Sequence, residues 1–503
     1  MNRIIKAVLL TAAAAALLLC SCGETAAPYD SQSSVSGDTP ASAPVPVVSV
    51  ETESDELGGS YTEIILSDSG ISVTGSGAAV SGSTVTITEK GSYLISGSLS
   101  DGRIIVNAEK ADGSTVRLFL NGITVNCSYG APLYIQSAKK TVITLCDGTL
   151  NSLSDSDAGA DDDQKGCLYS RDDTVINGSG SLSVNGKHNG IHCLNDLRIQ
   201  GGTVTVSSKN HGIKGNDSVI ISEGSISVEC GGDGIKTDNT EEAEKGFILV
   251  TGGSITVDAG DDGFHADRSL TVNGGTITVT NSYEGLEATE IYVNGGTIDI
   301  TASDDGVNAA DCISDAPSGW GGGMKAQNGV TLEMNGGYLH INASGDGFDS
   351  NNTAVMTGGT LIIEGPTDSG NGAIDYEASF TITGGTLIAV GASGMAAMPS
   401  AGTQCAFMTN VPAAKAGSTV SVCDSDGNEL FSTVCSKAFG NVVFSSPELE
   451  TGGTYVIKIN GVDSATVSQS SVRVGSQPGG MGGGMGGGMG GGMGGGMGGG
   501  KRR

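Results

Sequence analysis

The sequence EGSISVECGGDGIK at residues 223–236 is the first of four consecutive copies of one pattern. The other copies read GGSITVDAGDDGFHAD from Gly252, GGTITVTNSYEGLEA from Gly274 and GGTIDITASDDGVNAA from Gly295. Each copy contains a glycine turn, a strand that alternates apolar and polar residues, and a corner made of an acidic residue followed by glycine. One unit of this size cannot bury its apolar side alone, so we expect the copies to stack.

The spacing of the copies defines the repeating unit. The commonest step between equivalent turn glycines is 21 or 22 residues, which is too short for two helices with their turns. Within each copy the apolar residues alternate with a period of two, which is typical of strands. The second glycines of the turns are Gly202, Gly224, Gly253, Gly275, Gly296, Gly337, Gly359 and Gly385. Three short strands per unit fit this spacing.

Apolar residues at equivalent positions predict three inward-facing columns. One copy contributes Leu270 and Val272 before its turn, Ile277 and Val279 after it, and Leu286 after the acidic corner. The next copy repeats these sets as Ile291/Val293, Ile298/Ile300 and Val307. The 83 glycines and the 4% aromatic content suit tight turns and stacked β-branched ladders. We therefore predict an all-β fold, a parallel β-helix with very little helix.

Residues 1–22 are typical of a secretion signal. Arg3 and Lys6 precede an apolar run, Ala7 to Leu19, that is too short to span a membrane as a helix. The sequence LCSCG that ends this region resembles a bacterial lipobox, with Cys22 as the lipidated residue. The alternative is an ordinary secretory signal cut nearby. Both interpretations place the protein outside the cytoplasm, and the lipobox predicts an extracellular, cell-surface protein held to the membrane only by a lipid anchor.

Composition divides the rest of the chain into four parts. Residues 23–60 are rich in Ser, Thr, Ala, Pro and Glu, which predicts a flexible stalk. The repeats occupy residues 61–400. Residues 401–475 lack the glycine corner and predict either final capping coils or a small β-sandwich that protects the end of the stack. Residues 476–503 form a Gly/Met-rich tail that we expect to be disordered.

Two insertions and one cysteine pair stand outside the repeat. Residues 154–165 are rich in aspartate and predict a solvated loop, with a cation site as the alternative. Residues 311–325 carry the only tryptophan, Trp320, in a run of glycines. Cys423 and Cys435 flank a predicted hairpin and could form a disulfide.

The acidic residues of the repeat create an electrostatic problem. The formal net charge of −30 argues against a nucleic-acid partner and against direct attraction to other polyanions. Stacking would also place carboxylates about 5 Å apart, where each pair repels by roughly 1 kcal/mol in water and several-fold more near a protein surface. The corner column contains Asp233, Asp262, Glu284, Asp305 and Asp346, the neighbouring column contains Glu287, Asn308, Asp349 and Asp375, and Asp304 adds another oxygen ligand. Positive charge should therefore lie among them.

Calcium is the expected source of that charge. Lys214, Lys236 and His265 occupy the second column in earlier copies and can neutralise some of the acids. From Glu284 to Asp349, both columns contain only carboxylate or amide side chains. Such oxygens, with backbone carbonyls at the glycine corners, suit calcium at about 2.3–2.6 Å. The alternative is that Asp-Gly pairs only make turns, but turns do not require an acid or amide two positions beyond the glycine.

Several motifs resemble a known family. They are DGRIIVNA, LFLNGITV, NDLRIQGGTVTV, GGDGIKTDN, SYEGLEATEIYVNGGTIDITASDDGVNAA and GDGFDSN. Over most of residues 61–400 they resemble the bacterial secreted carbohydrate-binding domain-containing family. The resemblance implies a right-handed parallel β-helix with bound calcium, similar in architecture to pectate lyases, and binding to plant cell-wall polysaccharides including cellulose and acidic pectic sugars. It maps the calcium-associated corners onto Asp262, Glu284, Glu287, Asp304, Asp305, Asn308, Asp346 and Asp349.

The residues themselves are compatible with polysaccharide binding. A polyuronate and this chain are both acidic, so contact needs a cation that bridges their carboxylates. Neutral glucans instead need aromatic platforms, which are scarce here. We expect Lys236, His265 and Trp320 to contact polysaccharide, although Trp320 could instead anchor its loop. Tyr283 and Tyr376 are weaker candidates, with ordinary packing as the alternative.

Two further functions stay open. A calcium-dependent polysaccharide lyase needs a base beside the metal, and Lys236 and Lys214 stand in the second column near Asp262. Charge balance is the alternative explanation of both lysines. The other possibility is a structural or adhesive surface protein that calcium stiffens. For the binding function the sequence nominates no catalytic residue.

Overall fold

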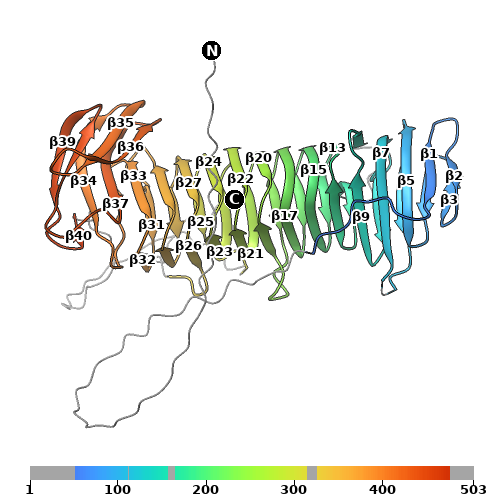
Figure 1. The fold of residues 1–503 in the computed structure, drawn as a ribbon, viewed down its shortest axis with the longest axis horizontal. Coiled ribbons are helices and arrows are strands. Elements are labelled where there is room, and N and C mark those ends of the chain that lie inside the picture. Colours follow the sequence, from blue (N-terminus) through green and yellow to red (C-terminus); the bar gives the residue numbers. More distant parts are fainter. Residues whose placement is uncertain (1–50, 112, 157–164, 314–325, 476–503) are drawn as a thin grey trace, which may run out of the picture. The chain divides into compact units, whose positions relative to one another are not determined.

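The fold is a stack of β-strand coils. The computed structural model describes residues 51–111, 113–156, 165–313 and 326–475. Within these ranges the chain forms only strands and turns. The described residues therefore contain no helix that could cross a membrane. The coils follow one another in chain order, from β5 to β33 (Figure 1). The predicted parallel β-helix is confirmed.

The strands of successive coils pair in parallel to form three faces. The first face contains β4 (Thr84–Ile87), β6 (Arg103–Asn107), β8 (Leu133–Ser137), β11 (Gly166–Ser170), β14 (Asn189–Cys193), β16 (Ile213–Gly215), β18 (Ile235–Thr237), β25 (Val307–Ala309), β28 (Phe348–Ser350) and β31 (Ile374–Tyr376). The second face contains β1 (Thr62–Leu66), β9 (Lys140–Leu145), β12 (Thr174–Gly178), β19 (Phe247–Val250), β26 (Thr331–Met334), β29 (Thr353–Met356) and β32 (Ser379–Ile382).

The third face follows the glycine turn in each coil. It contains β10 (Leu150–Asp155), β13 (Ser181–Gly186), β20 (Ser254–Ala259), β22 (Thr276–Asn281), β24 (Thr297–Ala302), β27 (Tyr338–Ala343), β30 (Thr360–Glu364) and β33 (Thr386–Gly391). Longer strands bend from one face into the next. These are β5 (Gly91–Leu99), β7 (Thr115–Cys127), β15 (Asp196–Ser208) and β17 (Ser218–Cys230), which join the second and third faces, and β21 (Phe264–Val272) and β23 (Leu286–Val293), which join the first and second.

The core consists of the predicted apolar columns. Leu270 lies opposite Ile291, and the columns of Ile277 and Leu286 continue in the same way with Ile298 and Val307. Their side chains are fully buried. Burying one such side chain stabilises the fold by roughly 1.5–3 kcal/mol. Because every coil adds the same contacts, strand register is fixed along the stack.

The glycine turns allow the coils to approach closely. Gly275 and Gly296 have φ angles of +89° and +84°, a region that residues with a Cβ seldom adopt. A Cβ added to Gly296 would also lie 2.9 Å from the carbonyl oxygen of Gly275 in the preceding coil. Glycine is therefore required at this turn for two independent reasons.

Antiparallel strands close both ends of the described stack. At the start, β2 (Ser72–Thr74) pairs with β1, and β3 (Ala78–Ser81) pairs with β4. At the other end, β37 (Phe439–Ser445) pairs with both β33 and β34 (Ala406–Ala414), and β40 (Arg473–Val474) lies beside β34. A separate antiparallel sheet contains β36 (Glu429–Cys435), β35 (Ser418–Cys423), β38 (Thr454–Ile459) and β39 (Val462–Ser468).

The disulfide that the sequence left open in this C-terminal region does not form. Cys423 and Cys435 are free thiols. In the β35–β36 pair, Cys423 lies opposite Glu429 and Cys435 lies opposite Ser418, so the two cysteines occupy opposite ends of the hairpin. Their spacing around a turn was insufficient to place the two sulfur atoms together.

Candidate functional site

The predicted second column is one continuous row on the first face. Strand register places each member directly opposite the next, about 4.8 Å away across the sheet. In order along the stack, the row contains His192, Lys214, Lys236, His265, Glu287, Asn308, Asp349 and Asp375. The side chains of this row therefore change from basic to acidic along the β-helix.

The corner acids beside this row form hydrogen bonds between coils. Asp233 Oδ1 accepts a hydrogen bond from the backbone N–H of Asp262 (3.3 Å), and Asp262 Oδ1 accepts one from the N–H of Glu284 (3.3 Å). Further along, Asp305 Oδ1 accepts the N–H of Asp346 (2.6 Å). Each of these carboxylates thus satisfies a backbone donor of the next coil, a structural role that the sequence did not reveal.

In the earlier coils, cationic side chains neutralise the acids. Lys236 Nζ lies 2.5 Å from Asp233 Oδ2, and His211 Nδ1 lies 3.3 Å from the same oxygen. Burial would raise the pKa of Asp233, but these two partners outweigh burial and lower it. Burial likewise opposes the charge on Lys236, yet Asp233 raises the pKa of that lysine. Lys214 forms an ion pair with Asp238.

His265 is the last cation of the row and contacts three carboxylates. Its Nδ1 lies 2.5 Å from Glu287 Oε2 and 3.1 Å from Asp262 Oδ2, and its Nε2 lies 3.4 Å from Asp267 Oδ1. Burial disfavours the imidazolium, but the carboxylates raise the pKa of His265 to about 11. His265 also lowers the pKa of Glu287 against the effect of burial. Asp262 keeps a pKa raised to about 6, chiefly by burial and also by neighbouring carboxylates.

In the later coils, acids are crowded against one another. Burial, and then the charge of neighbouring carboxylates, raises the pKa of Glu284 to about 9, of Asp349 to about 8 and of Asp305 to about 7. Burial also raises the pKa of Asp346 to about 6, with Asp375 adding to the effect. A cation among these groups would favour their ionised forms and lower these values.

Asn308 lies among these acids with an unsatisfied oxygen. It is 9% exposed, and its Nδ2 donates a hydrogen bond to Glu284 Oε2 (3.0 Å). Among the described residues, its buried Oδ1 has no hydrogen-bond partner. Strand register places it between Glu287 and Asp349. Leaving such an oxygen unpaired costs about 1–3 kcal/mol, and a bound cation would satisfy it.

The later coils fit an oxygen-binding cation better than the earlier ones. Carboxylate and amide oxygens fixed on adjacent strands are the ligands that calcium prefers. Among the described residues, the groups of three acidic or histidine side chains that bring possible ligand atoms within 4.8 Å of one another lie nearer the earlier coils: Asp262, His265 and Glu287, and Asp233, Asp261 and Asp262. In the first group the cation His265 is itself a member, and in the second Lys236 contacts Asp233. From Glu284 to Asp349 the row holds no basic side chain, so a bound cation could act there as the counter-charge and as a partner of Asn308 Oδ1.

The aromatic candidates for sugar contact differ in their exposure and in their hydrogen bonds. Tyr283 is 49% exposed and directly precedes Glu284 at the corner. The Tyr376 hydroxyl instead donates a hydrogen bond to the carbonyl of Met398 (2.9 Å), which indicates a packing role. Trp320 and Cys22 lie outside the described residues.

Sequence analysis missed a second polar site on another face. The predicted stalk extends to residue 60, but Glu53 forms ion pairs with Arg117 and Lys140. The three residues are far apart in the sequence, and Glu53 is one of several acids in its segment. No local pattern could have identified this contact.

Comparisons with known proteins found one matching family model, one similar protein and one similar structure. The sequence model of the carbohydrate-binding domain-containing protein family matches residues 81–329. A protein of that description from Acetivibrio thermocellus is 50% identical over 177 residues, which cover 34% of this chain and 61% of the relative. The match thus spans less than two thirds of that relative. A solved structure, the gadolinium derivative of a polysaccharide lyase-like protein from C. thermocellum, is 36% identical, with a TM-score of 0.42, and the match covers 48% of this chain and 95% of that one. The family model and the Acetivibrio thermocellus relative thus carry the same description, that of the family which the sequence motifs resemble.

Proposed function

We propose that this protein binds acidic polysaccharide in a calcium-dependent manner through the later coils of the first face. The observation that carries the proposal is the buried, unpaired Oδ1 of Asn308 among carboxylates whose pKa values are raised. A hard divalent cation accounts for both features, because it accepts oxygen ligands and favours ionised carboxylates. The family supports a carbohydrate as the partner.

The chain's own residues would hold and orient the cation. Glu284, Asn308 and Asp349 are fixed by strand register and by the Asn308–Glu284 hydrogen bond, and Asp305 and Asp346 lie in the adjacent corner column. Calcium takes six to eight oxygen ligands, so it can bind protein oxygens and a sugar carboxylate together. The acids of the chain would otherwise repel a polyuronate, which makes the cation the selective element.

Acidic pectic sugars suit this surface better than cellulose. Flat neutral glucans need exposed aromatic rings. Beside the acidic corners, the aromatic side chain that the structure describes as exposed is Tyr283. Calcium bridging instead requires a carboxylate on the sugar. We therefore place polygalacturonate-like chains ahead of cellulose.

Binding without cleavage is favoured over a lyase. A lyase base must be neutral to accept a proton, but Lys236 lies 2.5 Å from the Asp233 carboxylate and its pKa is raised. Lys214 is similarly engaged with Asp238. Both candidate bases therefore act as counter-ions in the row.

Sedimentation with insoluble ligand tests the proposal. The full chain is mixed with covalently cross-linked pectate beads, which stay insoluble without calcium, or with cellulose, each with calcium or with chelator. We expect retention on pectate with calcium, loss of retention with chelator, and no new ultraviolet absorbance from unsaturated sugar ends. Asn308→Ala should weaken retention, whereas Asn335→Ala, in the exposed asparagine ladder at the turns, should not. Equal retention with calcium and with chelator would reject calcium dependence.

The cellular location is part of the same proposal. Lipidation at Cys22 would hold the binding surface outside the cytoplasm at the cell surface, where polysaccharide is available. In cells that process lipoproteins, Cys22→Ala should move the protein from the membrane fraction to the medium. Continued membrane association of Cys22→Ala would reject the lipid anchor.

A further inference from the structure

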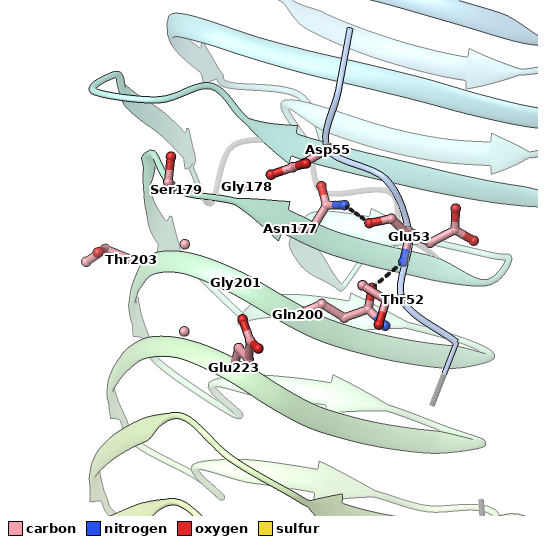
Figure 2. Close-up of a pocket in the computed structure, with 12 residues that line it drawn as sticks. Thr52, Glu53, Asp55, Asn177, Gly178, Ser179, Gln200, Gly201, Thr203 and Glu223 are labelled. Carbon is pink, nitrogen blue, oxygen red and sulfur yellow. Dashed lines mark hydrogen bonds between the residues drawn. The ribbon is translucent and has the colours of Figure 1, made fainter. Parts of the chain in front are cut away.

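Residues 51–57 cross the second face as a strap held by side-chain amides (Figure 2). Gln200 uses both ends of its amide: Oε1 accepts the backbone N–H of Glu53 (3.0 Å), and Nε2 donates to the carbonyl of Glu51 (2.6 Å). Asn177 Nδ2 donates to the carbonyl of Glu53 (3.0 Å). The two amides thus form hydrogen bonds with the backbone of an extended segment.

The carboxylate of Glu53 completes the contact. Its Oε2 lies 2.9 Å from Arg117 Nη2, and its Oε1 contacts Lys140 Nζ. Burial opposes the ionised form of Glu53, but the two cations lower its pKa. Every polar group of Glu53, both in the backbone and in the side chain, is therefore bound.

The β-helix itself supplies this site. Arg117, Lys140, Asn177 and Gln200 come from four strands, β7, β9, β12 and β15, that lie side by side on the second face. Asn177 and Gln200 are 3% and 9% exposed, so the coils hold them in place. An open groove of about 430 Å³ continues beside the strap, and Ser179 and Thr203 are among its lining residues.

The strap lacks the backbone strand pairing that holds the coils. Residues 51–57 belong to no strand in the described part of the chain and are held by side chains instead of a β-ladder. Gly58 and Gly59 follow it, Gly59 with a φ of +73°, and a Cβ added at either position would meet no atom within 4 Å. Two unrestricted glycines form a natural hinge. Loss of the Glu53 carboxylate would remove both ion pairs of the strap.

We propose that Arg117, Lys140, Asn177 and Gln200 form a second, calcium-independent site for uronate residues of an acidic polysaccharide, which Glu53 occupies as an intramolecular competitor. The ligand class rests on the proposed function. A uronate presents a carboxylate to the two cations and hydroxyl and ring oxygens to the two amides, as Glu53 does with its carboxylate and backbone. Because the strap is tethered, its effective concentration lies in the millimolar range, so the site opens only to dense or multivalent ligand.

Removing the competitor tests this inference on the full chain. Binding of soluble polygalacturonate is measured in the presence of chelator for wild type, for Glu53→Ala, and for the matched control Glu56→Ala, which removes another acid of the same strap. We expect Glu53→Ala to gain affinity by about tenfold or more, and Glu56→Ala to behave as wild type. Adding Arg117→Ala to Glu53→Ala should abolish the gain.

The outcomes separate this inference from the proposed function. Calcium-dependent retention of the wild type tests the later coils of the first face alone, whereas chelator-resistant binding of Glu53→Ala tests the strap site alone. Limited proteolysis within residues 51–57 reports whether the strap has opened, and a variant that lacks these seven residues opens it irrespective of Glu53. A deletion variant that is folded but gains no affinity in chelator would overturn the inference and leave the strap as a structural clasp.

Discussion

The earlier and later coils of the first face share one backbone arrangement but balance their charges differently. In the row from Lys214 to His265, each basic side chain contacts carboxylates of its own or a neighbouring coil. In the row from Glu287 to Asp375, acids face acids and Asn308 keeps an unpaired oxygen. The strands and the register are the same in both halves.

The two halves therefore differ in where the counter-charge of their acids comes from. A lysine or histidine belongs to the chain itself, so the earlier coils do not depend on a dissolved divalent ion for their counter-charge. A dissolved divalent ion is present only when its concentration allows, so the later coils should respond to calcium and pH. The helix would therefore carry an ion-insensitive part and an ion-sensitive part in one continuous core.

Removing the cation at the boundary should have the largest effect. His265→Gln leaves Asp262, Asp267 and Glu287 without their shared imidazolium, and breaking a buried charge pair costs about 3–5 kcal/mol of unfolding free energy. Because the pKa of His265 is raised to about 11, its contribution is complete below the unfolded value of about 6.5 and is lost as pH rises through 11. Denaturant titration at pH 7 measures the loss, with the exposed Lys415→Gln as control. If added calcium restored none of the stability lost in His265→Gln, a divalent ion could not replace the side-chain cation at this position.

The pH dependence of the calcium-free protein should be the next largest effect. The pKa values of Asp346, Asp305, Asp349 and Glu284 are raised to about 6, 7, 8 and 9. Between the unfolded values near 4 and these folded values, the folded state binds more protons, so the free energy of unfolding falls as pH rises from about 4 to 9. We expect a loss on the order of a few kcal/mol in chelator and a flatter profile with calcium. If the unfolding free energy depended on pH in the same way in chelator and in calcium, the later coils would not be sensitive to the ion.

Asp349→Asn should change stability and ion binding in opposite directions. At pH 8 to 9 the amide removes a buried charge that repels Asp375 and Asp305, so the calcium-free protein should gain roughly 1–3 kcal/mol. The same change removes a cation ligand and should weaken calcium affinity. Thermal unfolding in chelator and calorimetric titration measure the two effects separately. A loss of stability in chelator would show that the Asp349 carboxylate stabilises the fold more than its repulsion of the neighbouring acids destabilises it.

Tyr283 should give the smallest effect. Its exposed ring at the acidic corner can stack on a sugar, and one aromatic contact is worth about 0.5–1.5 kcal/mol. Tyr283→Ala should therefore lower polysaccharide affinity by about 2- to 10-fold, whereas Tyr283→Phe should retain it. Affinity measured with calcium, beside unchanged calcium binding, isolates the ring. Equal losses in both variants would assign the effect to the hydroxyl.

The sequence predicted the features that repeat. The period-two columns and the turn glycines predicted the β-helix, and the constant step between copies predicted that Glu287, Asn308 and Asp349 would share one row. Contacts that occur only once could not be predicted in this way. His211 contacts Asp233 from outside the repeating positions, and Glu53 reaches Arg117 across 64 positions of sequence.

The pairing of β37 with β33 determines how such a chain can grow. The antiparallel strand covers the edge of the third face, which would otherwise be open to another coil or another molecule. Duplication of a repeat inside the stack would lengthen the row on the first face while leaving this antiparallel pairing intact. The protein can thus lengthen one coil at a time without exposing this edge of the third face.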